Sequence, residues 1–489
     1  MVPPKQSDEQ AFGRTAVHGA VYSGIAQIFK VLITLASTIV LARILSPSDY
    51  GVIAMTTPIA NFIGIFQNFG LNQAVVQTRT LRLYQVNALF FYSIFASLGL
   101  ALALLLLAPF VGLFYGDPRA STVTAASAAT MVVVGSTLQH TALLTRAMRY
   151  RLLSLIDVAV AASTFLFTFA FAVWWASYWA LWFGTFCGTL VNAVLVWHFD
   201  RWRPRRRIVL RSARALMIFG ANLTGFNVLN FLSRNLDNVL IARAWGADSV
   251  GLYDRSYRLM MMPINNINAP LSRIMLPILS RVNSDAARYR RIYLLSLRTL
   301  GLGSVPGAMA AAMCSDQLVP LLLGPTWSAA SPIFFWLSLA GATQPISNAV
   351  GWIMISQGRA DRLFQWSLVY APFTILSFFV GLPWGPAGVA AAYFFGQLAL
   401  VPILYAWAPR NTPIKTSDIY AALAPSLIGS GLAWIVVSQA RDALSPLALF
   451  VLAVLLCYLL SALVQAAEPT GRRDLIEFAR LVFSLVKRR

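Results

Sequence analysis

Residues 178–207 read YWALWFGTFCGTLVNAVLVWHFDRWRPRRR, an apolar run that ends in a cluster of arginines. The run 178–198 is long enough for a helix to cross the hydrocarbon core of a bilayer, which takes about 20 residues. The same pattern, an apolar run followed by a short hydrophilic gap, recurs along the whole chain. It predicts fourteen transmembrane helices, at about 17–44, 52–77, 85–111, 121–145, 152–174, 178–198, 215–242, 252–280, 292–314, 329–356, 363–381, 386–407, 417–437 and 444–466.

The basic residues are distributed unevenly over the gaps between these runs. Of the 38 Lys and Arg residues, 28 fall in alternate gaps and six lie within the runs, while the opposite gaps hold only Arg43, Arg119, Arg243 and Arg441. Cytoplasmic loops of membrane proteins collect Lys and Arg, so this bias indicates orientation as well as span number. We therefore expect a multi-pass protein of the bacterial inner membrane with both termini in the cytoplasm.

Composition excludes an ordinary soluble domain, because 58% of the residues are hydrophobic, 11% are charged and the mean hydropathy is +0.68. The net charge of +21 would suit nucleic acid, and RWRPRRR at 201–207 looks like a basic binding patch. Because that segment lies in a short loop between two spans, we interpret it as a topological anchor that meets anionic membrane lipid. The three cysteines lack metal-ligand spacing and no HExxH motif occurs, so neither nucleic acid nor a metal ion is expected as a partner.

Part of the sequence repeats at an offset of 200 residues. The tripeptide LAR at 41–43, followed by Gly51, returns as IAR at 241–243, followed by Gly251. Six spans per copy would give both copies the same orientation, related by an axis along the membrane normal. The predicted order is a cytoplasmic segment (1–16), an N-lobe (17–198), a basic cytoplasmic linker (199–214), a C-lobe (215–407), two extra helices (417–466) and a basic amphipathic cytoplasmic tail (468–489).

Polar groups share one face of the first span and one face of the seventh, where hydrocarbon would not tolerate them. Residues three and four apart lie on the same side of a helix, and the two sets are equivalent under the 200-residue offset. They are Gln27, Lys30, Thr34 and Ser37 in the first span and Asn227, Asn230, Arg234 and Asp237 in the seventh. An ionisable residue inside a membrane is a functional-site hypothesis by default, so we expect these faces to line a substrate cavity. Arg273 either joins that cavity or reaches out to the cytoplasmic surface.

Alternatives stay open for the charges of this polar face. Arg234 and Asp237 either form a structural ion pair within one helix or contribute to substrate binding. Lys30 either pairs with Asp237 or serves an anion from outside the protein. Asp157, on the fifth span, is expected to pair with Arg151 near the cytoplasmic surface.

The eighth span is marked by proline. Pro263, Pro270 and Pro277 are seven residues apart and hence lie roughly on one face. Bent or broken helices in transporters are tolerated where they meet protein or a watery cavity. We interpret these prolines as a hinge, with ordinary tolerance of proline in membrane helices as the alternative. Arg255 and Arg258, at the start of the same span, form a gate or simply anchor it.

Several stretches resemble a known family. PSDYG at 47–51 leads into FGLNQA at 69–74, NLDNVLI occupies 235–241, and GLY at 251–253 and SYRL at 256–259 follow. Together they resemble the polysaccharide transporters of the MOP superfamily, in particular the Wzx-type flippases of the colanic-acid and exopolysaccharide branch. The resemblance covers the first ten spans well and the last four more loosely.

The resemblance implies an all-α, MATE-like fold, with two six-helix bundles around a central cavity that opens alternately to each side. It implies transport of undecaprenyl-pyrophosphate-linked oligosaccharide repeat units to the periplasmic leaflet, for assembly of exopolysaccharide or lipopolysaccharide. A pyrophosphate is anionic and suits a cavity that holds Lys30, Arg234 and Arg273. The polysaccharide polymerase and the chain-length machinery are expected protein partners. No cofactor is expected, and coupling to Na⁺ or H⁺ stays open.

A MATE-like multidrug or cation antiporter is the alternative function. Such exporters depend on acidic residues in the membrane, whereas Asp237 is the one deep acid of spans one and seven and has a basic neighbour. An enzyme is not expected, because the sequence contains no nucleophile–base pair, phosphate-binding loop or metal cluster.

Overall fold

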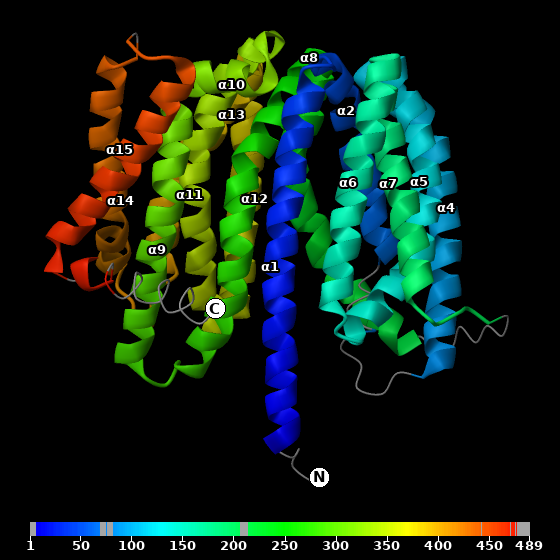
Figure 1. Ribbon diagram of the computed structural model, residues 1–489, viewed down its shortest axis with the longest axis horizontal. Helices are drawn as coiled ribbons and strands as arrows, with labels where there is room; N and C mark the ends of the chain where they lie inside the picture. The colour runs from blue at the N-terminus through cyan, green and yellow to red at the C-terminus, as the bar shows by residue number, and fades with distance from the viewer. Residues whose placement is uncertain are drawn as a thin grey trace. The chain divides into compact units, whose positions relative to one another are not determined.

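The computed structural model consists of long α-helices, with no strand among the residues that it describes (Figure 1). Those residues are 6–68, 75, 82–205, 214–441, 443–469, 471–474 and 476. Contacts divide the chain into two compact units, Met1–Gly251 and Leu252–Arg489. The all-α polytopic fold is thereby confirmed. The lobe, linker and tail boundaries stay predictions; residues 206–213 of the predicted linker and most of the predicted tail lie outside the described residues.

The helices of the first unit follow the apolar runs of the sequence. Gly116 adopts a left-handed φ of 70°, and the Asp117 side chain accepts a hydrogen bond from the backbone N–H of Arg119, so one helix ends and the next begins within three residues. The helices are α1 (Gln6–Ala42), α2 (Pro47–Asn68), α4 (Leu83–Tyr115), α5 (Pro118–Arg146), α6 (Tyr150–Trp175), α7 (Tyr178–Phe199) and the first part of α8 (Arg214–Arg281). Within this unit α1 packs along α6, and α6 along α7.

The second unit contains the rest of α8 and the helices that follow it. They are α9 (Ala286–Met313), α10 (Ser315–Leu323), η2 (Pro325–Ala330), α11 (Ser331–Ser356), α12 (Ala360–Gly381), η3 (Leu382–Trp384), α13 (Gly385–Trp407), α14 (Thr416–Gln439) and α15 (Pro446–Ala467). The core of this unit contains Tyr289, Tyr293 and Leu297 of α9, all fully buried. An ion pair between Arg298 and Asp474 attaches the residues after α15 to α9.

Eight helices in the described part of the chain are long and apolar enough to cross a membrane, or nine if α9 and α10, bent by 86°, form one span. One of the eight, Asp361–Trp407, contains two of the predicted spans, as α8 also does. Helices α2 and α11 have span length but are not among these eight. The predicted number of fourteen is consistent with these helices without being fixed by them.

α8 joins the two predicted spans around residue 246. Gly246 has φ 78° and ψ −173°, a conformation that is open to glycine and strained for other residues. The helix is therefore two helices merged across a kink, and the chain passes from the first compact unit to the second five residues after it.

The two repeated glycines, Gly51 on α2 and Gly251 on α8, lie at a close approach between these helices. A β-carbon on Gly51 would lie 1.8 Å from the carbonyl oxygen of Ala247, and one on Gly251 would lie 2.0 Å from the carbonyl oxygen of Pro47. The offset of 200 relates Pro47 to Ala247 as it relates the glycines, so it exchanges the two contacts. Reciprocal contacts of this kind are the signature of a two-fold axis. We call this contact the glycine crossing.

Candidate functional site

Lys30 of α1 and Asp157 of α6 form an ion pair between two predicted spans. Lys30 Nζ lies 3.7 Å from Asp157 Oδ2, and the two side chains are 43% and 65% exposed. With a rise of ~1.5 Å per residue, Asp157 lies about 10 Å along α6 from its start, and Lys30 about 18 Å along α1 from its end. The expected pairing of Asp157 with Arg151 is corrected, because packing of α1 along α6 brings Lys30 to Asp157 instead. Of the two alternatives for Lys30, the pairing with Asp237 is not found among the described residues, and service to an external anion stays a prediction.

The surroundings of this pair explain why it forms. A cation in the middle of a membrane helix costs roughly 2.5–3.5 kcal/mol on insertion scales, and an opposite charge on a neighbouring helix reduces that cost. Neither side chain is buried in the unit, and neighbouring residues of α1, such as Ile28 and Phe29, are also exposed. The pair therefore lies at an exposed surface of the first unit.

Arg234 and Asp237 share α8 but do not form the ion pair that their spacing allowed. Asp237 is buried, and its Oδ1 accepts a hydrogen bond from the backbone N–H of Asn238 at 2.8 Å, whereas the side chain of Arg234 is exposed. No ion pair joins the two within the described part of the chain, so the intrahelical structural pair is not formed. Of the other polar positions, Gln27 is exposed on α1, and the side chains of Asn227 and Asn230 lie outside the described residues.

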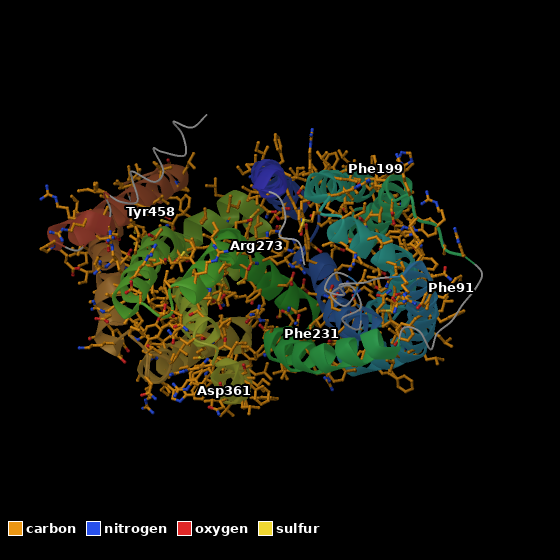
Figure 2. All side chains as sticks on the ribbon, turned by 90° about the horizontal axis from the view of Figure 1, so that it is seen from below. Phe91, Phe199, Phe231, Arg273, Asp361 and Tyr458 are labelled. Atoms are coloured by element: carbon orange, nitrogen blue, oxygen red, sulfur yellow. The ribbon has the colours of Figure 1, made fainter. Side chains whose placement is uncertain are left out.

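Arg273 lies in the second unit, on the last part of α8, as Figure 2 shows. Its side chain is exposed, and it stands eight residues before the end of the helix, about 12 Å at ~1.5 Å per residue. A long arginine side chain can reach the membrane surface from that depth. Both expectations for Arg273, cavity lining and anchoring, therefore remain predictions.

The proline positions do not coincide with the kink of α8. Pro263, Pro270 and Pro277 lie within helical backbone, and the position with non-helical φ and ψ is Gly246. Pro263 and Pro277 are exposed, while the side chain of Pro270 lies outside the described residues. A hinge at the prolines stays a prediction about motion.

Asp254 connects the two arginines expected to form a gate. Its Oδ2 accepts a hydrogen bond from Arg258 Nε at 2.7 Å and lies 3.8 Å from Arg255 Nε, and its side chain is 8% exposed. A buried carboxylate between two guanidinium groups is well compensated. This triad lies in the second part of α8, eight residues after Gly246, and its role as a gate stays a prediction.

A buried contact that sequence reasoning did not find attaches the basic segment to the first unit. His140 Nδ1 lies 2.7 Å from Asp200 Oδ2, and the ring of His140 packs against Trp197 and Trp202. Because His140 and Asp200 are 60 residues apart and belong to no motif, no signal in the sequence joined them. The contact holds the beginning of the 201–205 segment against the ends of α5 and α7. The described residues contain no cluster of His, Cys, Asp or Glu that could hold a metal ion.

Comparison with known proteins assigns this architecture. A family model described as a polysaccharide biosynthesis protein matches residues 40–332. The chain is similar to the lipopolysaccharide biosynthesis protein WzxC of Escherichia coli (strain K12), with 23% identity over 386 residues and 78% of each chain covered. It is also similar to the teichuronic acid biosynthesis protein TuaB of Bacillus subtilis (strain 168), with 23% identity over 477 residues, 95% of this chain and 98% of TuaB.

Solved structures share the fold. The lipid II flippase MurJ in an inward closed conformation matches with a TM-score of 0.75 and 13% identity, over 93% of this chain and 100% of MurJ. An inward-facing multidrug resistance MATE family transporter of the MOP superfamily matches with a TM-score of 0.59 and 13% identity, over 80% of this chain and 96% of that chain. At these identities the likeness concerns the fold alone, and it confirms the MOP-type helical architecture expected from the sequence.

Proposed function

The chain belongs to the polysaccharide biosynthesis protein family, and on that basis we propose that it is a flippase for lipid-linked oligosaccharides. The substrate is an oligosaccharide repeat unit on undecaprenyl pyrophosphate, which moves from the cytoplasmic to the periplasmic leaflet of the bacterial inner membrane. Both termini lie in the cytoplasm, as the distribution of Lys and Arg predicts. The product feeds the assembly of exopolysaccharide or lipopolysaccharide.

The observation that carries this proposal is the exposed cation Lys30 at membrane depth. Its described partner, Asp157, is itself exposed, and the distance of 3.7 Å between Lys30 Nζ and Asp157 Oδ2 is too long for a hydrogen bond. Arg234 adds a second exposed cation that Asp237 does not neutralise. Cations that are held in a membrane without firm partners suit an anionic ligand, and a pyrophosphate offers several charged oxygens. This also argues against cationic drugs as the substrate.

Transport divides the substrate between three environments. The pyrophosphate contacts Lys30 and Arg234, and amide side chains such as Gln27 donate to sugar hydroxyls. The prenyl chain stays in the hydrocarbon of the membrane, because moving it into a polar cavity would not lower its free energy. The two lobes then open alternately to each side around a site near the middle of the membrane. No bond of the substrate is broken, so this function needs no catalytic residue.

The first test measures where lipid-linked oligosaccharide accumulates in cells depleted of the protein, using a membrane-impermeant sugar label. Accumulation in the cytoplasmic leaflet with loss of polymer is the expected result. An unchanged distribution with polymer still made refutes the proposal and favours drug or ion export. Purified protein in vesicles that contain the labelled lipid then tests whether the chain flips it without the polymerase and chain-length machinery, which we propose as its cellular partners.

A further inference from the structure

The ion pair between Lys30 and Asp157 is looser than the ion pair between Arg290 and Asp418. In the pair of Arg290 with Asp418, two hydrogen bonds of 2.6 and 2.9 Å form, and the Asp418 side chain is 11% exposed. Between Lys30 and Asp157 the distance of 3.7 Å is too long for a hydrogen bond, and both side chains are exposed. The pair is therefore held by charge attraction alone and can be exchanged.

Asp157 also lies beside the Lys30 ammonium group, where an anionic ligand of Lys30 would meet it. It lies on a different helix from Lys30, and the contact between them is made across the line along which α1 and α6 pack. A phosphate that forms charge-assisted hydrogen bonds with Lys30 competes with this carboxylate, because two anions beside one ammonium group repel each other. Binding of an anionic substrate and pairing with Asp157 therefore oppose each other at Lys30.

We propose that Asp157 is an internal counter-ion, which occupies Lys30 in the empty transporter and gives way to the phosphate of the bound substrate. This inference rests on the proposed function and adds a positioning residue to it. The counter-ion would act in the return step of the transport cycle, after the substrate has been released. A transporter that has released its anionic substrate must change conformation again with Lys30 at membrane depth, where an uncompensated cation is unfavourable. Asp157 supplies the missing negative charge during that step.

The experiment uses the purified full-length protein and its variant Asp157→Asn, which keeps the shape of the side chain and removes the charge. Farnesyl pyrophosphate and inorganic pyrophosphate serve as binding probes. Since an exposed ion pair is worth at most ~1 kcal/mol, the variant is expected to bind farnesyl pyrophosphate up to about fivefold more tightly than the wild type. In vesicles, repeated flipping of lipid-linked oligosaccharide should become slower while the first turnover does not.

Three further variants make the result specific. Asp157→Glu retains the charge and should bind and flip as the wild type does. Asp157→Asn in a Lys30→Ala background should give no gain in affinity. Asp316→Asn removes a carboxylate from the ion pair with Arg441, whose side chains are similarly exposed at 58% and 45%, and should change neither binding nor flipping.

The outcomes separate the two proposals. Unchanged or weaker binding by Asp157→Asn, in a wild type that binds and flips, overturns the counter-ion role and leaves the flippase intact. A gain in affinity that persists without Lys30 also overturns it, because Asp157 then acts through another group. A wild type that neither binds the probes nor moves the lipid-linked oligosaccharide overturns the flippase proposal and the counter-ion role together.

Discussion

Replacing Gly51 by alanine should destabilise the first unit at the glycine crossing. The new β-carbon would lie 1.8 Å from the carbonyl oxygen of Ala247, and real β-carbons essentially never approach a heavy atom within 3.0 Å, so a backbone must move by at least 1.2 Å. Overpacking costs about 1–3 kcal/mol, and we expect the upper end because the obstacle is backbone and cannot rotate away. At ~2–4 °C per kcal/mol for a unit of this size, ~3 kcal/mol lowers the Tm by roughly 6–12 °C.

Thermal unfolding of the purified protein in detergent micelles, followed by circular dichroism, measures this shift. Gly64→Ala is the matched control, because it lies on the same helix and its β-carbon would meet nothing within 4 Å. Alanine is favoured over glycine in a helix by up to ~1 kcal/mol, so the control should be neutral or slightly stabilising. Equal unfolding temperatures for the two variants would refute the close approach. Combining Gly51→Ala with Gly251→Ala should cost less than the sum, since one separation of the helices relieves both clashes.

Three further predictions concern charged groups. Lys30→Ala and Arg234→Ala should each abolish flipping of lipid-linked oligosaccharide while the amount of protein in the membrane stays normal; full activity of both variants in vesicles would contradict the cationic site. Hydrogen bonds from Arg119 hold the pKa of the Asp117 carboxyl below its usual value of 3.8, so the carboxylate contributes stability above that value and loses it as the pH falls through the lower, folded-state pKa. Asp117→Ala should therefore unfold more easily by about 1 kcal/mol at neutral pH, and its difference in Tm from the wild type should shrink only in strong acid; a difference already lost at pH 5 would be incompatible with the lowered pKa. Asp254→Asn should lower the Tm, because it removes the buried negative charge that two guanidinium groups share; thermal unfolding of Asp248→Asn, a carboxylate on the same helix, provides the comparison.

The class of fold was predictable from the sequence because the membrane imposes its own pattern. Apolar runs of span length have to recur, and the helices of the structure follow them. The repeat was predictable as well, because LAR at 41–43 returns as IAR at 241–243. In the structure, both tripeptides consist of two buried residues followed by an exposed arginine. The exact number of spans was less accessible, because α2 and α11 have span length but are not among the described helices that are apolar enough to cross a membrane.

The partners of the charges were not predictable, because side-chain contacts between helices depend on how those helices pack. Lys30 and Asp157 are 127 residues apart, and no local spacing relates them. Arg234 and Asp237 had a suitable spacing, but Asp237 turns to the neighbouring backbone N–H at residue 238. The kink of α8 had a local signal in Gly246, which was outweighed by the more conspicuous prolines.

The glycine crossing bears on the ancestry of the chain. A half-length ancestor that carried one such glycine would have met the same glycine of a second copy of itself, and duplication followed by fusion would have preserved the contact in a single polypeptide. After fusion, a substitution in one half no longer appeared in the other half. The position of Lys30 corresponds to Asn230, and that of Arg234 to Thr34, so each half now carries its cation one turn away from the other's. The two glycines therefore keep equivalent positions in the two halves, whereas the two cations do not.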